Sequence, residues 1–307
     1  MTVYESIIVG GGPAGITAGI YLARKKVSFA MLTMDVGGQT LWTGDVENYV
    51  GHQYITGPEL AEKFAAHLRE FNIELNEGEK VAGIIKSGDV FTVSSEKKEY
   101  TAKTVIVCTG RKPKELSVPG EKEFKNRGVT YCATCDGPLF AGKKVAVIGG
   151  GNAGLEAALQ MARIADRVYL IEKLAYISAD RILTDKFAEY GNAEVITGAA
   201  ITEIYGDKFV NGIRIKNSGG TEREIAAEGV MVEIGSVPNS GIAAGAAKNE
   251  WGEIIVDCSV KTSVPGLFAA GDVTNVYKKQ IIIACGEGAK AAIAASEYLY
   301  FINDREH

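Results

Sequence analysis

The 307-residue chain is poor in several residue types, and these shortages exclude classes of protein. It has only 3 histidines, 7 prolines and 5 cysteines, and an odd number of cysteines does not suit a secreted disulfide framework. A net charge of −5 argues against a nucleic-acid or anionic-membrane surface, because both need clustered Lys and Arg. The chain is therefore expected to bind neither nucleic acid nor membrane.

Long apolar runs and targeting signals are also missing. The closest approach to a membrane span, residues 280–302, is interrupted by Glu287, Lys290 and Glu297. The first residues carry Glu5 and no basic segment typical of a signal peptide, so we expect a cytoplasmic location. With 46% hydrophobic and 23% charged residues, a chain of this length is expected to fold into two domains, each with its own core.

Glycine is the residue in excess, with 37 copies, and it marks the first motif. Gly10, Gly12 and Gly15 separate an apolar strand expected at 4–9 from a helix expected at 16–26. In a dinucleotide fingerprint the first glycine makes the tight turn and the second lets the backbone approach a pyrophosphate. The third lets the helix pack on the strand. One such turn alone is weak support for a nucleotide site.

The same pattern recurs in the middle of the chain. Gly149, Gly151 and Gly154 separate a strand expected at 144–148 from a helix expected at 155–164. Because a strand–turn–helix–strand plan surrounds both glycine turns, the sequence predicts two dinucleotide sites. Further apolar strands are expected at 104–108, 230–234 and 266–270, and a helix at 281–301.

The chemical centre of the sequence is the pair Cys132 and Cys135. A zinc site would need a second paired set of ligands, which Cys108, Cys258, Cys285 and the histidines do not supply. A structural disulfide and a pair of inert thiols are two further interpretations. Two intervening residues suit a short, reducible disulfide, so a redox dithiol is the favoured interpretation. The remaining three cysteines are expected to be small buried residues.

Asp136 adjoins this pair and is a candidate general acid or base, because a reactive thiolate needs a proton acceptor nearby. The alternative is that it caps the following segment.

The cysteine pair stands shortly before Gly149, so the dithiol belongs to the second nucleotide domain. If the first domain holds FAD and the second holds a nicotinamide, the dithiol and the nicotinamide are on one body and cannot easily occupy one face of the flavin together. We therefore hypothesise a domain rotation that presents them alternately.

Seven short segments form a combined pattern that extends over nearly the whole chain. They are the two glycine turns, Gly37–Gln39, Val46–Asn48, Thr109–Gly110, Cys132–Gly137 and Gly266–Asp272. Together these segments resemble the low-molecular-weight thioredoxin reductase family. The resemblance implies an α/β fold of two Rossmann-like, three-layer domains, with the nicotinamide domain inserted in the FAD domain. It implies FAD-binding residues 1–113 and 246–307, NAD(P)H-binding residues 114–245, and a homodimer.

The resemblance also implies site residues. Cys135 would take electrons from the flavin, and the more exposed Cys132 would attack the partner disulfide. The expected FAD contacts are Gly10, Gly12, Pro13, Ala14, Gly15, Asp35, Gly38, Gln39, Asn48, Thr109, Gly110, Gly271, Asp272, Gln280 and Ile281. The expected nicotinamide contacts are Gly149, Gly151, Asn152, Ala153, Gly154, Glu172, Lys173 and Gly235.

Residues 137–140 and 279–290 carry a resemblance that is closer still, to the flavin module of alkyl hydroperoxide reductase. Because the first fingerprint begins at Gly10, we expect no extra N-terminal disulfide domain. Electrons are then expected to pass from Cys132 to a separate thioredoxin- or glutaredoxin-like protein. The alternatives are a peroxiredoxin system reached through a separate disulfide carrier, or a flavin relay fed by a donor other than nicotinamide.

The choice of nicotinamide depends on Glu172, which ends the second strand of the second fingerprint. An acid at this place bonds a ribose 2′-hydroxyl and repels a 2′-phosphate, so we predict NADH over NADPH. Two alternatives remain open. Lys173 or Arg181 could bind a 2′-phosphate and so accommodate NADPH. Glu172 could also be a solvated charge at the end of the strand with no role in cofactor binding. Oxidase-type or ferredoxin-linked flavoenzymes of similar fold lack the cysteine pair, which argues against them. No metal site is expected.

Overall fold

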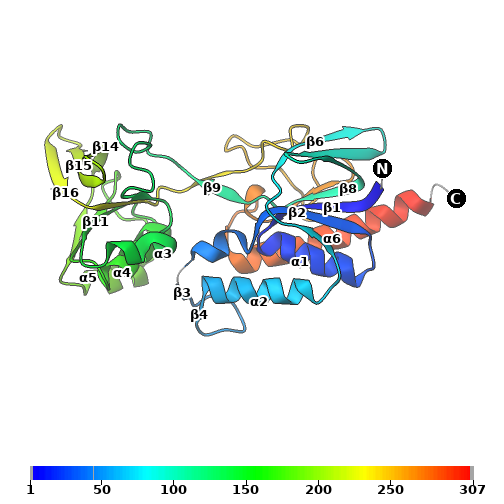
Figure 1. Ribbon diagram of the computed structural model, residues 1–307, viewed down its shortest axis with the longest axis horizontal. Helices are drawn as coiled ribbons and strands as arrows, with labels where there is room; N and C mark the ends of the chain where they lie inside the picture. The colour runs from blue at the N-terminus through cyan, green and yellow to red at the C-terminus, as the bar shows by residue number, and fades with distance from the viewer. Residues whose placement is uncertain (1–2, 44, 305–307) are drawn as a thin grey trace. The chain divides into compact units, whose positions relative to one another are not determined.

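The structure is a computed structural model that describes residues 3–43 and 45–304, except for the side chains of Asp45 and Cys135. The chain forms two compact units, one made of Met1–Lys112 with Val237–His307 and the other of Pro113–Ser236 (Figure 1). The second unit is thus inserted into the first, and the chain crosses between them twice.

The first unit is built on a mixed sheet. Its strands β1, β2, β5, β8 and β19 run parallel, and β6 and β7 extend the sheet by antiparallel pairing. The hydrogen-bonded order is β5 (Glu74–Asn76), β2 (Phe29–Val36), β1 (Val3–Gly11), β8 (Glu99–Val107), β7 (Val90–Ser95) and β6 (Val81–Ser87), with β19 (Leu267–Ala269) beside β8.

Three helices cover one face of this sheet: α1 (Pro13–Arg24), α2 (Gly57–Arg69) and α6 (Ile281–Asp304) (Figure 1). Side chains alternate across the strands, so Ile8 and Ile106 enter the core beneath the helices. Their neighbours Ile7 and Val105 enter a second core on the opposite face. The sheet therefore has a hydrophobic core on each of its two faces.

The second unit repeats this plan around an all-parallel sheet. Its order is β10 (Val129–Thr130), β17 (Gly229–Val232), β11 (Lys144–Ile148), β12 (Arg167–Ile171) and β13 (Ala193–Ile196). Val147 packs toward α4 (Asn152–Ala162) and α5 (Arg181–Ala188), whereas its neighbour Ala146 packs toward an antiparallel sheet. That outer sheet contains β14 (Ala199–Gly206), β15 (Val210–Asn217) and β16 (Glu222–Ala226).

In the parallel part of each sheet the strand order reverses direction next to the strand that carries the glycine turn. In the first unit the reversal lies between β1 and β8, and in the second between β11 and β17. Ligands of open α/β sheets bind at the carboxyl ends of the strands at such a reversal. The fold therefore puts each glycine turn at the expected binding edge.

The two crossings lie in the short strands β9 (Arg111–Pro113) and β18 (Ser236–Pro238), which pair with each other. The second crossing falls between Ser236 and Val237, before the boundary at residue 246 expected from the sequence. The intervening residues join the first unit because the Asn239 amide donates to the Gly110 carbonyl and Ala243 is buried in that unit's core.

The remaining short elements connect these layers. They are the strands β3 (Asp45–Val46) and β4 (Ile55–Thr56), the helix α3 (Ala133–Asp136), and the 3₁₀ turns η1 (Gly38–Trp42), η2 (Gly137–Phe140) and η3 (Gly271–Val273).

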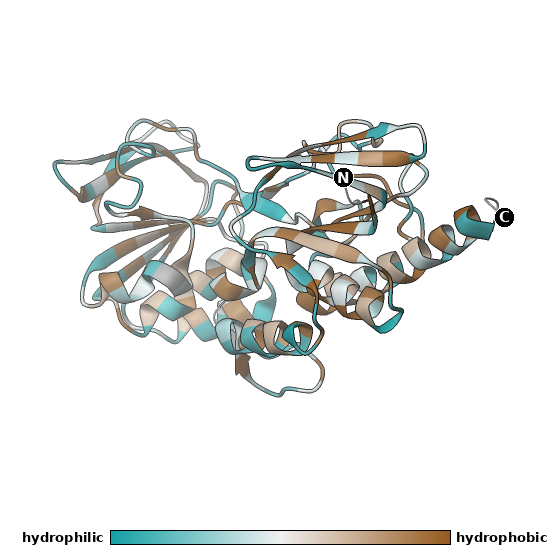
Figure 2. Ribbon diagram, turned by 45° about the vertical axis from the view of Figure 1, so that its right-hand side comes forward, coloured by the Kyte–Doolittle hydropathy of each residue, from teal (hydrophilic) through white to brown (hydrophobic). Residues whose placement is uncertain are grey.

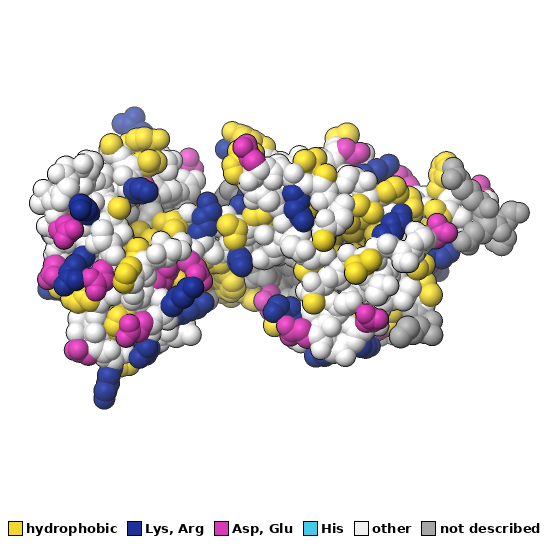
Figure 3. All heavy atoms as spheres, turned by 90° about the horizontal axis from the view of Figure 1, so that it is seen from above, with side chains coloured by type: hydrophobic (Ala, Val, Ile, Leu, Met, Phe, Trp, Pro, Cys, Tyr) yellow, Lys and Arg dark blue, Asp and Glu magenta, His cyan; other side chains and the backbone are white. Residues whose placement is uncertain are grey.

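Hydrophobic residues concentrate in the strands and on the helices (Figure 2). On the face drawn in Figure 3, basic and acidic side chains are interspersed. None of the helices in the described ranges is both long and apolar enough to cross a bilayer.

Candidate functional site

The first glycine turn leaves no room for side chains. Gly10 has a φ of +111°, and a Cβ there would lie 2.3 Å from the Cys108 carbonyl oxygen. A Cβ on Gly15 would lie 1.8 Å from the Gly10 carbonyl oxygen, so only glycine lets α1 begin this close to β1. The second turn repeats the geometry, because a Cβ on Gly154 would lie 1.8 Å from the Gly149 carbonyl oxygen.

Both turns end in helices whose first N–H groups have no side-chain cap. Gly12 is the N-cap of α1 and Gly151 is the N-cap of α4, and neither helix has a side-chain capping bond. The helix α2, by contrast, has a complete capping box formed by Thr56 and Glu59. The uncapped N–H groups, which include those of Ala14 in α1, are available to a pyrophosphate.

Four of the predicted FAD contacts outside the turn are joined in pairs by hydrogen bonds. Asp35, near the end of β2, accepts a bond from the Gly38 amide at 2.9 Å. The Asn48 side-chain amide donates to Oε1 of Gln280 at 3.3 Å, although the two residues are far apart in the sequence. Ile281 follows Gln280 as the first residue of α6. The fold thus brings Asn48 to the start of the last helix.

Thr109 and Gly110 follow β8 and are tied to the second chain crossing. The Thr109 hydroxyl donates to the Asn239 carbonyl at 2.8 Å, and the Asn239 side-chain amide donates to the Thr109 carbonyl at 2.9 Å. Gln39 donates from its side chain to the carbonyl of Arg111, one residue further on. The predicted FAD residues at this edge therefore stand beside the crossings.

Asp272 lies in η3, directly after Gly271, and its carboxyl group is largely buried. Burial raises the pKa of this carboxyl, while the charges of Lys279 and Arg111 act to lower it. Within the described residues no side chain or amide donates a hydrogen bond to the carboxylate. A ligand hydroxyl group placed here would satisfy a buried acceptor that the protein leaves open.

Glu172 directly follows β12 and contacts the second glycine turn. Its Oε2 accepts from the Gly150 amide at 2.6 Å, and its Oε1 accepts from the Leu174 amide at 2.7 Å. The exposed Lys173 lies between these two contacts. Glu172 thus places a carboxylate against the turn, where an adenosine ribose is expected.

The predicted contacts Asn152 and Ala153 begin α4 beside this carboxylate. Asn152 donates from its side chain to Oδ2 of Asp180 and accepts from the Asp180 amide, each at 2.8 Å. Gly235 follows β17 with a φ of +91°. All the predicted nicotinamide contacts thus lie at the carboxyl edge of one sheet.

Glu233 stands between β17 and Gly235 and was not predicted from the sequence. Burial, and secondly the nearby carboxylate of Glu156, raise the pKa of its carboxyl group to about 8. At neutral pH this group is mainly protonated, and it lies at the edge where the nicotinamide is expected.

The predicted dithiol begins at the start of α3. Cys132 directly precedes α3 (Ala133–Asp136) and is in a disulfide. Cys135 lies within α3, and its side chain is outside the described part of the structure. The Thr130 hydroxyl donates to Oδ2 of Asp136 and accepts from the Cys132 amide at 3.1 Å. Thr130 therefore holds the predicted acid–base residue against the backbone of the predicted nucleophile.

The other three cysteines are free thiols with different environments. Cys108 is buried, as expected, and burial raises its pKa to about 12. The prediction is wrong for Cys258, which is exposed because it lies in a surface turn, and Cys285 is only partly buried. No group of three or more His, Cys, Asp or Glu side chains is arranged to hold a metal ion among the residues that the structure describes.

With this geometry established, comparison with known proteins identifies the family. Residues 4–292 match the family described as pyridine nucleotide-disulphide oxidoreductase. The chain belongs to this family. The crystal structure of T. acidophilum thioredoxin reductase is 39% identical, covers 97% of this chain and 99% of its own, and superposes with a TM-score of 0.91. This similarity confirms the predicted α/β fold with two Rossmann-like domains and the resemblance to thioredoxin reductases.

Two longer relatives are similar over 96% of this chain. The F subunit of alkyl hydroperoxide reductase from Pseudomonas putida is 44% identical, and a protein named NADH dehydrogenase from Bacillus subtilis (strain 168) is 43% identical. The chain spans 58% of the length of each of these relatives.

Membership of the pyridine nucleotide-disulphide oxidoreductase family implies FAD and a nicotinamide cofactor, and the residues present fit both. Each glycine turn forms a cradle that a Cβ would fill, with uncapped helix N–H groups beside it. The buried Asp272 carboxylate offers an open acceptor beside the first cradle. FAD would supply the electron-pair chemistry, and the protein's residues would bind and orient it.

Sequence reasoning missed Thr130, Glu233 and the charged partners of Asp272. Thr130 could have been suspected because it stands two residues before Cys132. Nothing local marks Lys279 and Arg111 as the cations whose charges act on Asp272, because their positions around it depend on the fold.

Proposed function

We propose that this protein is a disulfide reductase that passes electrons from NADH through FAD to the Cys132–Cys135 disulfide. From there they pass to the disulfide of a thioredoxin- or glutaredoxin-like protein. The observation that carries the proposal is the disulfide state of Cys132, in the same unit as the second glycine turn and beside the Thr130–Asp136 hydrogen bond. The family gives the coarser activity, and this site supports the disulfide route.

The proposed reaction balances as NADH plus a proton plus a protein disulfide, giving NAD⁺ and two protein thiols. When bound, FAD would supply the two-electron chemistry between the nicotinamide and the Cys132–Cys135 disulfide, whose S–S bond breaks when it gains the electron pair. Cys132 then attacks the partner disulfide, and Cys135 resolves the mixed disulfide. Asp136, held by Thr130, would supply or accept the proton exchanged at the thiols.

NADH is the proposed donor because of the Glu172 carboxylate at the second turn. Its two backbone hydrogen bonds hold a negative charge at this turn, the region where the 2′-phosphate of NADPH is expected to bind. Repulsion between these charges disfavours NADPH. The kcat/KM for NADH should exceed that for NADPH by at least about tenfold, and the Glu172→Ala variant should narrow the ratio. A clear preference of the unmodified protein for NADPH would reject this donor.

The disulfide route is tested by absorbance. NADH should bleach the flavin, and DTNB should be reduced only after a thioredoxin-like protein is added. In the Cys135→Ser variant, NADH should still reduce the flavin, but the variant should no longer reduce the disulfide of the partner protein. Partner reduction at full rate by that variant would exclude the proposed dithiol role.

A second acceptor has specific support. The 44% identity to the F subunit of an alkyl hydroperoxide reductase favours a peroxiredoxin system reached through a separate disulfide carrier. Adding a purified carrier with its peroxiredoxin and following peroxide-dependent NADH oxidation separates this route from thioredoxin reduction. If NADH and NADPH both fail to bleach the flavin, a donor other than nicotinamide feeds the same dithiol.

The proposed mechanism includes a rotation of one unit relative to the other, because the dithiol and the nicotinamide belong to the same unit. A reversible covalent link between the units should stop multiple turnovers, and cleaving the link should restore them. Full activity of the linked protein would reject the rotation. We further propose a homodimer, to be checked by sedimentation, that acts in the cytoplasm where NADH is supplied.

A further inference from the structure

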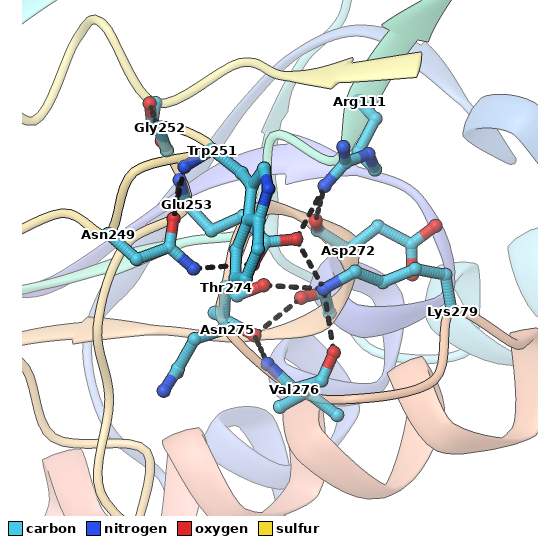
Figure 4. Close-up of polar contacts among 12 residues, drawn as sticks. Arg111, Asn249, Trp251, Gly252, Glu253, Asp272, Thr274, Asn275, Val276 and Lys279 are labelled. Carbon is cyan, nitrogen blue, oxygen red and sulfur yellow. Dashed lines mark hydrogen bonds and ion pairs between the residues drawn. The ribbon is translucent and has the colours of Figure 1, made fainter. Parts of the chain in front are cut away.

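Three charged side chains form a partly buried cluster in the first unit, next to Asp272 (Figure 4). Oε1 of Glu253 accepts from Nη1 of Arg111 at 2.8 Å and lies 3.1 Å from Nζ of Lys279. The Arg111 and Glu253 side chains are each 13% exposed, and the Lys279 side chain is 25% exposed. We call Arg111, Glu253 and Lys279 the charge cluster.

Hydrogen bonds within the protein engage Lys279 and Glu253 fully. Nζ of Lys279 donates to the carbonyls of Thr274 at 2.5 Å and Val276 at 2.7 Å, in addition to Glu253. Oε2 of Glu253 accepts from the Asn249 side-chain amide at 2.7 Å. An ammonium group has three donors, so Lys279 has none left for a ligand. The charge cluster therefore affects a neighbouring ligand by holding chain segments in place and by its electrostatic field, because Lys279 has no donor left for a direct hydrogen bond.

The charge cluster also joins the chain segments that carry the predicted flavin contacts. The backbone carbonyl of Arg111 accepts a hydrogen bond from the Gln39 side chain. Nη1 of Arg111 donates to the backbone carbonyl of Asp272 at 3.5 Å. Lys279 directly precedes Gln280, and through its bonds to the Thr274–Val276 segment it holds the turn after Asp272 against the start of α6. Loss of the cluster would release these segments from one another.

The charges of the cluster and of Asp272 balance. Two cations face the carboxylates of Glu253 and Asp272, and both cations act to lower the pKa of Asp272 while burial raises it. Partly buried charges are weakly screened, so removing one of them changes the potential at the neighbouring site. A cofactor that gains negative charge on reduction responds to that change.

We propose that Glu253, Arg111 and Lys279 are positioning residues for FAD that also set its reduction potential through their net charge. The cations favour the reduced cofactor and the Glu253 carboxylate opposes it. This inference rests on the proposed function only in that FAD binds at the first glycine turn. It requires neither NADH as donor nor any particular disulfide partner.

The test compares Glu253→Gln with Lys279→Met in the FAD-loaded protein. The midpoint potential of the flavin is measured against a reference dye with a chemical reductant, so the donor and the acceptor are both bypassed. We expect Glu253→Gln to raise the potential and Lys279→Met to lower it. Each shift should reach about threefold in the equilibrium constant with the dye, which is ~14 mV for a two-electron couple.

Matched controls remove the same charges from exposed neighbours on the same segments. Glu250→Gln and Lys278→Met should leave both the potential and the dissociation constant of FAD unchanged. For Lys279→Met we also expect at least about tenfold weaker FAD binding, which Lys279→Arg should largely restore. If the Lys279→Met variant retains no FAD, the electrostatic part of the proposal is tested by the midpoint potential of the flavin in the Glu253→Gln variant alone.

Two results would overturn the proposal. One is a potential for Glu253→Gln that does not differ from that of Glu250→Gln. The other is a shift in the same direction for Glu253→Gln and Lys279→Met, because a general loosening of the fold has no dependence on the sign of the charge removed.

Discussion

Glu233 offers a stability prediction that can be worked out from the structure. Its carboxyl group lies after β17, and its pKa is raised from 4.5 to about 8 by burial and then by the Glu156 carboxylate. The perturbation is Glu233→Gln, which keeps the shape of the side chain and removes its ionisation. The variant should be more stable than the natural protein at alkaline pH and nearly equal to it at acid pH.

The magnitude follows from proton linkage. Below pH 4.5 the carboxyl is protonated in both the folded and the unfolded chain, so it contributes no difference. As the pH rises toward 8 the unfolded chain loses the proton while the folded protein keeps it, and stability falls. A difference of about 3.5 pH units at about 1.36 kcal/mol each sets an upper limit of about 5 kcal/mol. Partial exposure of the side chain reduces this, so we expect about 2–4 kcal/mol at pH 8.5.

Hydrogen exchange of the amides in β11 and β17 is a suitable assay, because it reports the opening free energy of the second unit by itself. The free energy should be measured at pH 5, 6.5 and 8.5 in the FAD-loaded protein without nicotinamide. The advantage of the variant should be small at pH 5 and should grow through pH 6.5 to 8.5.

Glu189→Gln is the matched control, because Glu189 is an exposed glutamate of the same unit and its removal should leave the pH profile unchanged. Glu156→Gln should reproduce part of the effect, since it removes the smaller of the two causes. A difference between Glu233→Gln and the natural protein that stays constant from pH 5 to 8.5 would refute the reasoning.

Three further predictions concern the sites. Thr130→Val should lower kcat for partner reduction by about fivefold with flavin reduction by NADH unchanged, because Asp136 loses its hydroxyl donor; Thr130→Ser should restore the rate. Gly15→Ala should weaken FAD binding at least about tenfold, measured as flavin absorbance per protein, since its Cβ would lie 1.8 Å from a carbonyl oxygen. A maleimide at pH 7 should label the exposed Cys258 and leave Cys108 unlabelled, because burial raises the Cys108 pKa to about 12.

Local patterns predicted the framework of the fold well. The strand expected at 144–148 is confirmed as β11, and the helix expected at 281–301 is confirmed within α6 (Ile281–Asp304). The antiparallel strands β14, β15 and β16 were not predicted. Their pairing joins residues whose register depends on the hairpin and on the sheet beneath, and an apolar pattern alone does not specify either.

The candidate site divides in the same way. The two glycine turns and the cysteine pair are short motifs, so their chemistry is legible from consecutive residues. The position of the second crossing differs from the expected one because Asn239 is held by Thr109 and Gly110, far away in the sequence. The exposure of Cys258 likewise depends on a surface turn that no local signal marks.

Short stretches of sequence were enough to predict the family, the α/β fold and the two glycine turns with the dithiol between them. These features depend on residues close together in the chain, where backbone sterics and turn geometry dominate. Folding alone brings Arg111, Glu253 and Lys279 into one partly buried cluster and raises the pKa of the Glu233 carboxyl group. Those properties arise from burial and Coulomb interactions between distant segments, and they exist only once the chain has folded.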